Sequence, residues 1–266
     1  MMYKETIVKY SIAAIIIIAI AIAPTIGSFP LFYSANSQPV TAPNITRPLP
    51  VILVHGYFED ASIWLRWEQL LQSDGIQAFP VTFQQSSDEC GSAKDHAQEL
   101  SQIVHDVKRM TGQNQVNIVG HSKGGLDARV YLNNSIDSSD IANLIMIGTP
   151  NAGSPLADLD VSDPCVPAIN DIKTGAEDTL AVRNPNTQYY TIAGDWTPFG
   201  MYDCLEDEGG YYYYFYHGLQ PNDGIVPITS VESQSYFINL GHSPDCHQNL
   251  LGDIEYQSAR NVLLGR

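Results

Sequence analysis

Basic residues are scarce in this sequence. Its 266 residues include 13 lysines and arginines against 29 aspartates and glutamates, which gives a net charge of -16 at pH 7. A protein that binds nucleic acid needs a basic surface to neutralise phosphate groups, so the composition argues against nucleic acid as a partner. The acidic balance by itself indicates only solubility, or a saline or extracytoplasmic habitat.

Long hydrophobic runs are also lacking, except at the N-terminus. There, two lysines precede an uncharged, isoleucine-rich run over 10–23, an order typical of a secretory signal peptide. Ala21-Ile22-Ala23 has the form of a cleavage site, although Pro24 is unfavourable after it. The alternative is a retained membrane anchor within residues 7–30. Residues 1–33 are expected to be one or the other, and both interpretations export the rest of the chain.

Cysteine is rare, and none of the four cysteines forms a C-x-x-C pair. In an exported chain an even number of cysteines favours disulfides over free thiols. We therefore expect two disulfides among Cys90, Cys165, Cys204 and Cys246, for which three connectivities exist. A bridge from Cys246 to Cys204 or Cys165 would fix the loop around a neighbouring histidine.

Internal repeats are absent from the sequence, and the length fits one domain of about 220 residues after a leader. Residues 34–48 are rich in serine, proline, asparagine and threonine, which is typical of a linker. The predicted domain therefore covers 49–266.

Strand-like and helix-like segments alternate along this domain. Short apolar runs between turns are typical of strands buried on both faces, and apolar residues three and four apart are typical of helices. Strands are expected at 51–54, 76–83, 116–119, 141–147, 188–193 and 236–240, and helices at 61–71, 95–110, 126–132 and 248–264. This order predicts an α/β fold with a mostly parallel central sheet flanked by helices.

One hexapeptide, Gly120-His121-Ser122-Lys123-Gly124-Gly125, lies between a predicted strand and a predicted helix. Strand, G-x-S-x-G and helix in this order form a nucleophile elbow, a sharp turn that presents the serine hydroxyl. Glycines two residues before and after the serine avoid clashes where the chain approaches itself. Ser122 is therefore the candidate nucleophile.

The elbow sequence resembles that of secreted lipases and esterases of the α/β-hydrolase superfamily. Val51–Gly56 resembles the first core strand and oxyanion loop of those enzymes. Ile147–Pro155 resembles the G-T-P-H-x-G-S segment after their next strand, although Asn151 stands where histidine is usual. The likeness spans about 49–266, with a poorly matched middle. It implies an α/β-hydrolase fold and ester hydrolysis by a serine, a histidine and an acid, with no cofactor.

In such a triad the chain order is serine, acid, histidine. Asp223 is the favoured acid, because the segment Pro221–Pro227 resembles the N-D-G-x-V segment that carries the acid in related lipases. Asp195, directly after the strand at 188–193, is the alternative. An ordinary Asp-Gly turn is the non-catalytic interpretation of Asp223.

The base is expected after the last strand, where two histidines qualify. His247 is favoured because the following Gln248–Leu251 resembles the catalytic-histidine loop of small lipases. His242 lies almost directly after the predicted strand, which is early for a loop that returns to Ser122. The lesser candidates are His55, His121 and His217; the first two fit structural positions near the oxyanion loop and the elbow.

Two backbone N–H groups are needed to hold an oxyanion. One is expected from the residue after the nucleophile, Lys123. The other is expected from Tyr57, directly after His55-Gly56, with Phe58 as the alternative.

Residues 151–220 break the periodic pattern and are acidic, and related lipases carry lid or cap elements in this position. Aromatic residues near the expected entrance fit an acyl pocket or lid, or ordinary core packing: Tyr57, Phe58, Trp64, Trp196, Phe199 and the run 211–216. A structural calcium is the less favoured interpretation of Asp158, Asp160, Asp163, Asp203, Glu206, Asp207 and Glu208, since their spacing matches no ligand loop.

The function predicted is hydrolysis of a small-molecule or lipid carboxylic ester by an exported enzyme. A thioesterase, amidase or acyltransferase would use the same triad. A binding protein that keeps the fold without catalysis is the alternative of another class. The sequence predicts no oligomeric state.

Overall fold

The computed structural model describes residues 47–135, 138–159, 165–176, 183–196 and 221–266. They belong to one compact unit, Thr46–Arg266. The expected leader at 1–33, most of the linker and the aromatic run at 211–216 lie outside the described residues. Within the described ranges, no helix combines the length and apolar character needed to span a membrane.

A six-stranded sheet forms the centre of this unit, with strand order β2-β1-β3-β4-β5-β6. Every pairing between neighbouring strands is parallel. The strands are β1 Val51–Val54, β2 Ala78–Pro80, β3 Val116–His121, β4 Ile141–Ile147, β5 Gln188–Gly194 and β6 Ile238–Ser243. This is the parallel α/β architecture that the alternation of segments predicts.

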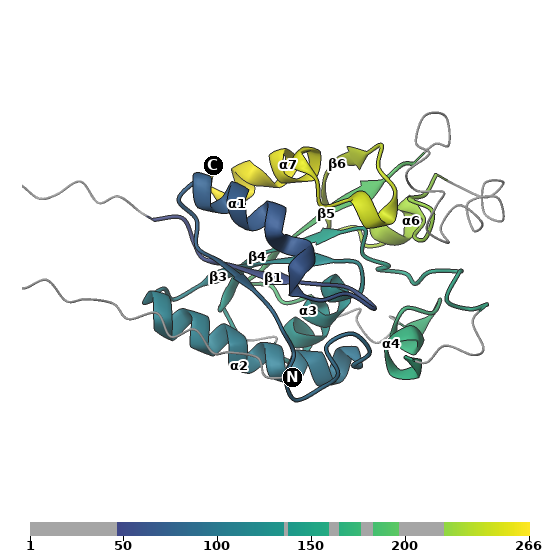
Figure 1. The fold of residues 1–266 in the computed structure, drawn as a ribbon, viewed down its shortest axis with the longest axis horizontal. Helices are drawn as coiled ribbons and strands as arrows, with labels where there is room; N and C mark the ends of the chain where they lie inside the picture. Colours follow the sequence, from purple (N-terminus) through teal and green to yellow (C-terminus); the bar gives the residue numbers. More distant parts are fainter. Residues whose placement is uncertain (1–46, 136–137, 160–164, 177–182, 197–220) are drawn as a thin grey trace, which may run out of the picture. The chain divides into compact units, whose positions relative to one another are not determined.

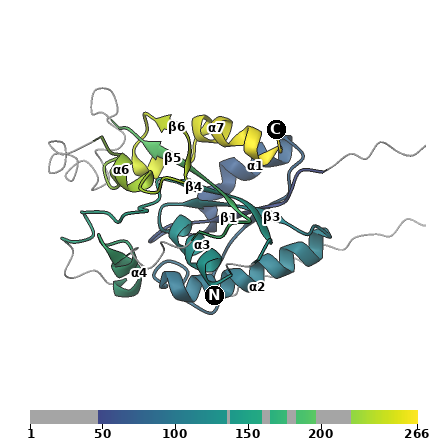
Figure 2. The ribbon, with the colours of Figure 1, turned by 180° about the vertical axis from the view of Figure 1, so that it is seen from behind.

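Helices lie on both faces of the sheet (Figures 1 and 2). The described helices are η1 Ala61–Trp64, α1 Leu65–Ser73, α2 Ala93–Thr111, α3 Lys123–Asn134, α4 Val166–Asp171, α6 Ile228–Val231, η4 His247–Asn249 and α7 Asp253–Leu263. One face carries α1 and α7, and the other carries α2 and α3.

The continuous apolar run of β1 reflects this double cover. Val51 and Leu53 belong to the cluster that includes the buried side chains of α1 and α7. Ile52 and Val54 belong to the cluster formed with α2 and α3. Because successive side chains of a strand point to opposite faces, a strand covered on both sides needs apolar residues at every position.

The segment boundaries differ from the expectations mainly at the sheet edges. β2 is shorter than 76–83 and ends at Pro80, which has no N–H to extend a ladder. β6 lies at 238–243 rather than 236–240, because an edge strand with only one buried side chain carries little apolar periodicity. α7 begins only at Asp253, after Gly252, and a separate 3₁₀ turn holds His247.

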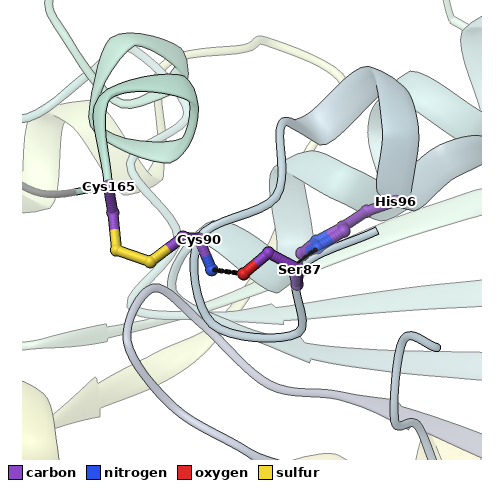
Figure 3. Close-up of a disulfide and its surroundings, with 4 residues drawn as sticks. All are labelled: Ser87, Cys90, His96 and Cys165. Carbon is purple, nitrogen blue, oxygen red and sulfur yellow. Dashed lines mark hydrogen bonds between the residues drawn. A yellow bond between two sulfur atoms is a disulfide. The ribbon is translucent and has the colours of Figure 1, made fainter. Parts of the chain in front are cut away.

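A disulfide joins Cys90, in the loop before α2, to Cys165, directly before α4 (Figure 3). Cys246 is also disulfide-bonded. The alternative that pairs Cys246 with Cys165 is therefore wrong, since Cys165 is already bonded to Cys90. Cys204 lies outside the described residues.

Candidate active site

Ser122 lies at the junction of β3 and α3, at the carboxyl edge of the sheet. Its φ is 49° and its ψ is -127°, and only one other described non-glycine residue, Phe58, has a positive φ. Its backbone N–H donates to Ile147 O at 2.8 Å, which holds the turn against the end of β4. A non-glycine residue in this conformation is strained, and strain of this kind is concentrated at functional sites.

Two glycines make the turn sterically feasible. A Cβ on Gly120 would lie 2.6 Å from the nitrogen of Gly125. A Cβ on Gly124 would lie 2.3 Å from His55 O. Both contacts are with backbone atoms, which cannot rotate away, so the elbow requires glycine at these positions. The second contact also brings the start of α3 against the end of β1.

Ser122, His247 and Asp223 form a continuous hydrogen-bonded row. Ser122 Oγ lies 2.8 Å from His247 Nε2, and His247 Nδ1 lies 2.7 Å from Asp223 Oδ2. All three side chains are buried. With a carboxylate accepting from Nδ1, the distal Nε2 is free to accept the hydroxyl proton of the serine. This is the geometry that general-base activation of a serine requires.

Asp223 is fixed from both sides. Its Oδ1 accepts from the N–H groups of Ile225 and Val226 at 2.9 and 2.7 Å, and its backbone carbonyl accepts from His247 N–H at 2.9 Å. The Asp-Gly turn thus orients a carboxylate that contacts the histidine. Asp195, the alternative acid, follows β5, and its backbone N–H donates to Ser243 O.

The other candidate histidines have different partners. His242 lies within β6 rather than after it, and its Nε2 is 2.7 Å from Glu232 Oε1 at the surface. His55 Nε2 is 2.9 Å from Asp88 Oδ1. His217 lies outside the described part of the chain. Of the histidines in that part, the one brought to Ser122 Oγ is His247.

The two expected oxyanion donors follow the carboxyl ends of neighbouring strands, Tyr57 after β1 and Lys123 after β3. Lys123 begins α3, and the N–H at the first position of a helix has no acceptor within the helix. The N–H of Phe58, the alternative donor, donates to Glu89 O at 3.0 Å. The N–H of Phe58 is therefore already engaged in a backbone hydrogen bond.

A second histidine–carboxylate pair, which no sequence motif predicts, adjoins this row. Glu59 Oε2 accepts from His121 Nδ1 at 2.9 Å and from Gly56 N–H at 2.7 Å. Burial alone would raise the pKa of Glu59, but the charge and hydrogen bond of His121 outweigh it and lower the pKa to about 2. Burial alone would lower the pKa of His121, but Glu59 raises it above its ordinary value. No sequence motif links these two residues, and the short separation of Glu59 from Gly56 in the sequence is the one signal that could have suggested a role.

A third pair lies under the first turn of α3. His96 Nδ1 is 2.7 Å from Asp127 Oδ2, and the ammonium of Lys123 donates to Asp127 Oδ1 at 2.7 Å. All three side chains are buried. Burial raises the pKa of Asp127, but the charges of Lys123 and His96 reverse that effect and hold the pKa below its usual value.

The aromatic residues expected at the entrance divide between core and surface. Trp64 is fully buried in the cluster with α1 and α7, and Trp196 is buried as well. Phe58 is 57% exposed beside the oxyanion loop. The core interpretation is therefore correct for Trp64.

Neither calcium nor another metal has an evident site in the described ranges, where no group of three histidine, cysteine or acidic side chains is suitably placed. Asp158, one of the acidic residues considered for calcium, accepts instead from the N–H and hydroxyl groups of Thr174. Asn151, at the position where relatives usually have histidine, is buried and accepts from Arg129 of α3 at 2.9 Å. It links the elbow helix to the segment after β4.

Residues 50–194 match the family model for palmitoyl protein thioesterase. The matched segment is more than half of the 266-residue chain and includes the elbow. The chain belongs to the palmitoyl protein thioesterase family. The segment that matches the family ends before Asp223 and His247, so the role of these two residues depends on the geometry alone.

Curated relatives of this member of the palmitoyl protein thioesterase family include triacylglycerol lipases from bacteria and yeast. The triacylglycerol lipase of Burkholderia plantarii is 30% identical over 147 residues, which are 53% of this chain and 40% of that protein. The triacylglycerol lipase of Pseudomonas fragi is 31% identical over 120 residues, which are 43% and 39% of the two chains. The matched part thus spans about two fifths of each relative.

Solved structures show the same fold over most of the thioesterase-family chain. The mature form of Bacillus licheniformis lipase BlEst2 has a TM-score of 0.68 at 24% identity, covering 85% of this chain and 96% of that one. A monoacylglycerol lipase of Paleococcus ferrophilus has a TM-score of 0.54 at 14% identity, covering 82% and 96%. At these identities the likeness shows the α/β-hydrolase fold.

Proposed function

We propose that this protein is a serine hydrolase that cleaves carboxylic esters through an acyl-enzyme. The observation that carries the proposal is the row of two short contacts, Ser122 Oγ to His247 Nε2 at 2.8 Å and His247 Nδ1 to Asp223 at 2.7 Å. The lipase relatives support an ester as the substrate.

In the proposed reaction, His247 Nε2 takes the proton of Ser122 Oγ as the oxygen attacks the ester carbonyl. Asp223 holds the imidazole through Nδ1–H and stabilises its charged form. The N–H groups of Tyr57 and Lys123 donate to the oxyanion, and the N-terminal end of α3 favours the negative charge there. His247 then gives its proton to the leaving alcohol, and water, deprotonated in turn by His247, releases the acid. This chemistry requires no cofactor.

We propose the same triad for a second substrate class, thioesters. The specific reason is the family itself, whose description is palmitoyl protein thioesterase. A thiolate leaves more readily than an alkoxide, so the histidine and oxyanion donors need no rearrangement to serve both substrates. We further propose that 49–266 is the catalytic domain and that residues 1–33 export it, as a cleaved signal or as an anchor.

The test is hydrolysis of p-nitrophenyl esters from C2 to C16, and of S-acyl thioesters of matched chain length, by the full chain and its Ser122→Ala variant. The proposal predicts activity that Ser122→Ala reduces by about 10⁶-fold. The ratio of ester to thioester turnover ranks the two substrate classes. A folded wild-type protein that hydrolyses neither class, and whose Ser122 does not react with a fluorophosphonate, would instead be a non-catalytic binding protein.

A further inference from the structure

Glu59 connects two of the loops that form the candidate site. Its Oε2 accepts from Gly56 N–H, in the loop after β1, and from His121 Nδ1, directly before Ser122. A Cβ on Gly56 would lie 2.8 Å from Ser122 Cβ, so the oxyanion loop and the elbow already touch. One carboxylate oxygen therefore fixes the position of the oxyanion loop relative to the nucleophile.

His121 extends the connection to a third loop. Its Nε2 lies 3.0 Å from the backbone carbonyl of His247. A carbonyl only accepts hydrogen bonds, and so does a carboxylate, so both ring nitrogens of His121 must donate. The ring is then a buried imidazolium whose charge is balanced by Glu59.

Other charged groups near this pair come from each neighbouring segment. The ring of His247 is 5.0 Å from that of His121, centroid to centroid, and Asp223 acts on His121 through its negative charge. Asp60 follows Glu59 in the same loop, but it is exposed and caps η1 through Ser62 N–H. Among these groups Glu59 alone contacts both the oxyanion loop and the residue before the nucleophile.

We propose that Glu59 is a positioning residue, which holds the oxyanion loop through Gly56 and the backbone of His247 through the His121 imidazolium. This proposal rests on the proposed function, since it assigns Glu59 a role in the same reaction. Without the carboxylate, the imidazolium loses its counter-charge and reverts to a neutral ring. At least one of the three hydrogen bonds that join Gly56, His121 and the carbonyl of His247 through this pair is then lost, and the nucleophile, base and oxyanion donor are no longer held at fixed separations.

The first experiment measures kcat and KM of the full-length chain and its Glu59→Gln variant on the p-nitrophenyl ester that the wild type cleaves best. Small displacements of catalytic groups cost rate rather than affinity, so we expect kcat to fall about 10- to 100-fold with little change in KM. Asp60→Asn, the neighbouring carboxylate, is the matched control and should stay within about twofold of wild type. His121→Gln should resemble Glu59→Gln, and the double variant should lose no more than either single variant.

A purely structural role would lower kcat by the same factor at every pH. The proposal instead predicts that the ratio of wild-type kcat to Glu59→Gln kcat falls as the pH rises above the ordinary range of histidine, because wild-type His121 then also becomes neutral. A ratio that stays constant with pH, or a Glu59→Gln kcat within twofold of wild type, overturns the proposal.

A measurement on the unmodified protein decides the question if Glu59→Gln does not fold. Ring ¹⁵N NMR of the wild type should show both nitrogens of His121 protonated at pH 7, and a neutral ring overturns the proposal. An inactive wild type that is also unreactive toward a fluorophosphonate rejects the proposed function itself. An active wild type with a dead Ser122→Ala variant and an unaffected Glu59→Gln rejects only the role of Glu59.

Discussion

Two buried histidine–carboxylate pairs, His247 with Asp223 and His96 with Asp127, share almost the same geometry. In each, Nδ1 is 2.7 Å from a carboxylate oxygen, that of Asp223 for His247 and that of Asp127 for His96. They differ at the other nitrogen. Nε2 of His247 faces a hydroxyl, Ser122 Oγ, whereas Nε2 of His96 faces a carbonyl, Ser87 O, each at 2.8 Å.

That single partner distinguishes the pair that we propose to be reactive from the structural pair. A hydroxyl can give its proton to a neutral imidazole, but a carbonyl has none to give. His96 is further confined by the ring of Phe83, stacked 3.8 Å away, and Asp127 is shared with the ammonium of Lys123. A histidine paired with an acid is therefore no evidence of catalysis until the group facing its second nitrogen is known.

Within the comparison of the two carboxylates, the larger expected effect on turnover comes from Asp223→Asn. An amide that keeps the shape but not the charge favours the wrong tautomer of His247, so we expect kcat to fall about 10⁴-fold. Stability should change little by comparison. Steady-state kinetics measure the loss of kcat, and urea unfolding measures the change in stability. Asp195→Asn is the control that keeps near-normal turnover. Equal losses in the two variants would contradict the choice of acid.

Asp127→Asn should act on stability instead. It leaves the ammonium of Lys123 buried without a counter-charge, which typically costs about 3 to 5 kcal/mol. Urea unfolding measures this loss, and Asp106→Asn, in an exposed pair with Arg109, is the control with a small effect. Turnover per folded molecule should fall far less than in Asp223→Asn. If Asp127→Asn instead left the protein stable and lowered kcat about 10⁴-fold, it would contradict the assignment of the His96–Asp127 pair as structural.

Removing the Cys90–Cys165 disulfide tests the loop that closes the structural pair. Ser87, whose carbonyl contacts His96, lies three residues before Cys90, and its hydroxyl accepts from the Cys90 N–H (Figure 3). The bridge spans 75 residues, so replacing both cysteines by alanine should cost about 2 to 4 kcal/mol. Hydrogen exchange should rise first around Ser92–Ala97 and not around Asp223. An equal increase in exchange around Ser92–Ala97 and around Asp223 would show that the disulfide does not act locally.

The sequence predicted the sheet well because its central strands are buried and mostly apolar, and β1 is apolar at every position. The elbow was predicted equally well, because Gly120 and Gly124 lie so close to backbone atoms that only glycine fits at these two positions. The edge strands were predicted less well. β6 fully buries only Ser243, so nothing in its composition marks where it begins or places His242 inside it.

The contacts around the triad could not be predicted, because they join residues far apart in the chain. Glu59 and His121 are 62 positions apart, and His121 and the carbonyl of His247 are 126 apart. Sequence patterns report the periodicity of one element, whereas these contacts depend on how three loops meet at the carboxyl edge of the sheet. The role of Lys123 shows the same limit, since its position suggested only a backbone donor and not a buried ammonium.

The Glu59–His121 pair is intermediate in burial and makes stability depend on pH. The pKa of Glu59 falls on folding, so its contribution is present above pH 4.5 and is lost as the pH falls toward about 2. The pKa of His121 rises, so its contribution is complete below pH 6.5 and is lost at higher pH. The free energy of unfolding of the wild type should therefore exceed that of Glu59→Gln most between pH 4.5 and pH 6.5. After discounting for partial exposure, we expect a difference of about 1 to 2 kcal/mol. Thermal unfolding across pH measures the difference, and a pH-independent difference would contradict the ion pair.

The smallest effect is expected at the exposed pair, His242 and Glu232, whose side chains are 40% and 30% accessible. Water solvates both groups in the folded and in the unfolded state, so the pair contributes about 0 to 1 kcal/mol to the free energy of unfolding. His242→Ala should leave turnover within about twofold of wild type, while His247→Ala should lose nearly all of it. Kinetics of the two variants on one ester decide between them. If His242→Ala were the inactive one, contact with Ser122 Oγ would not be the feature that distinguishes the reactive histidine.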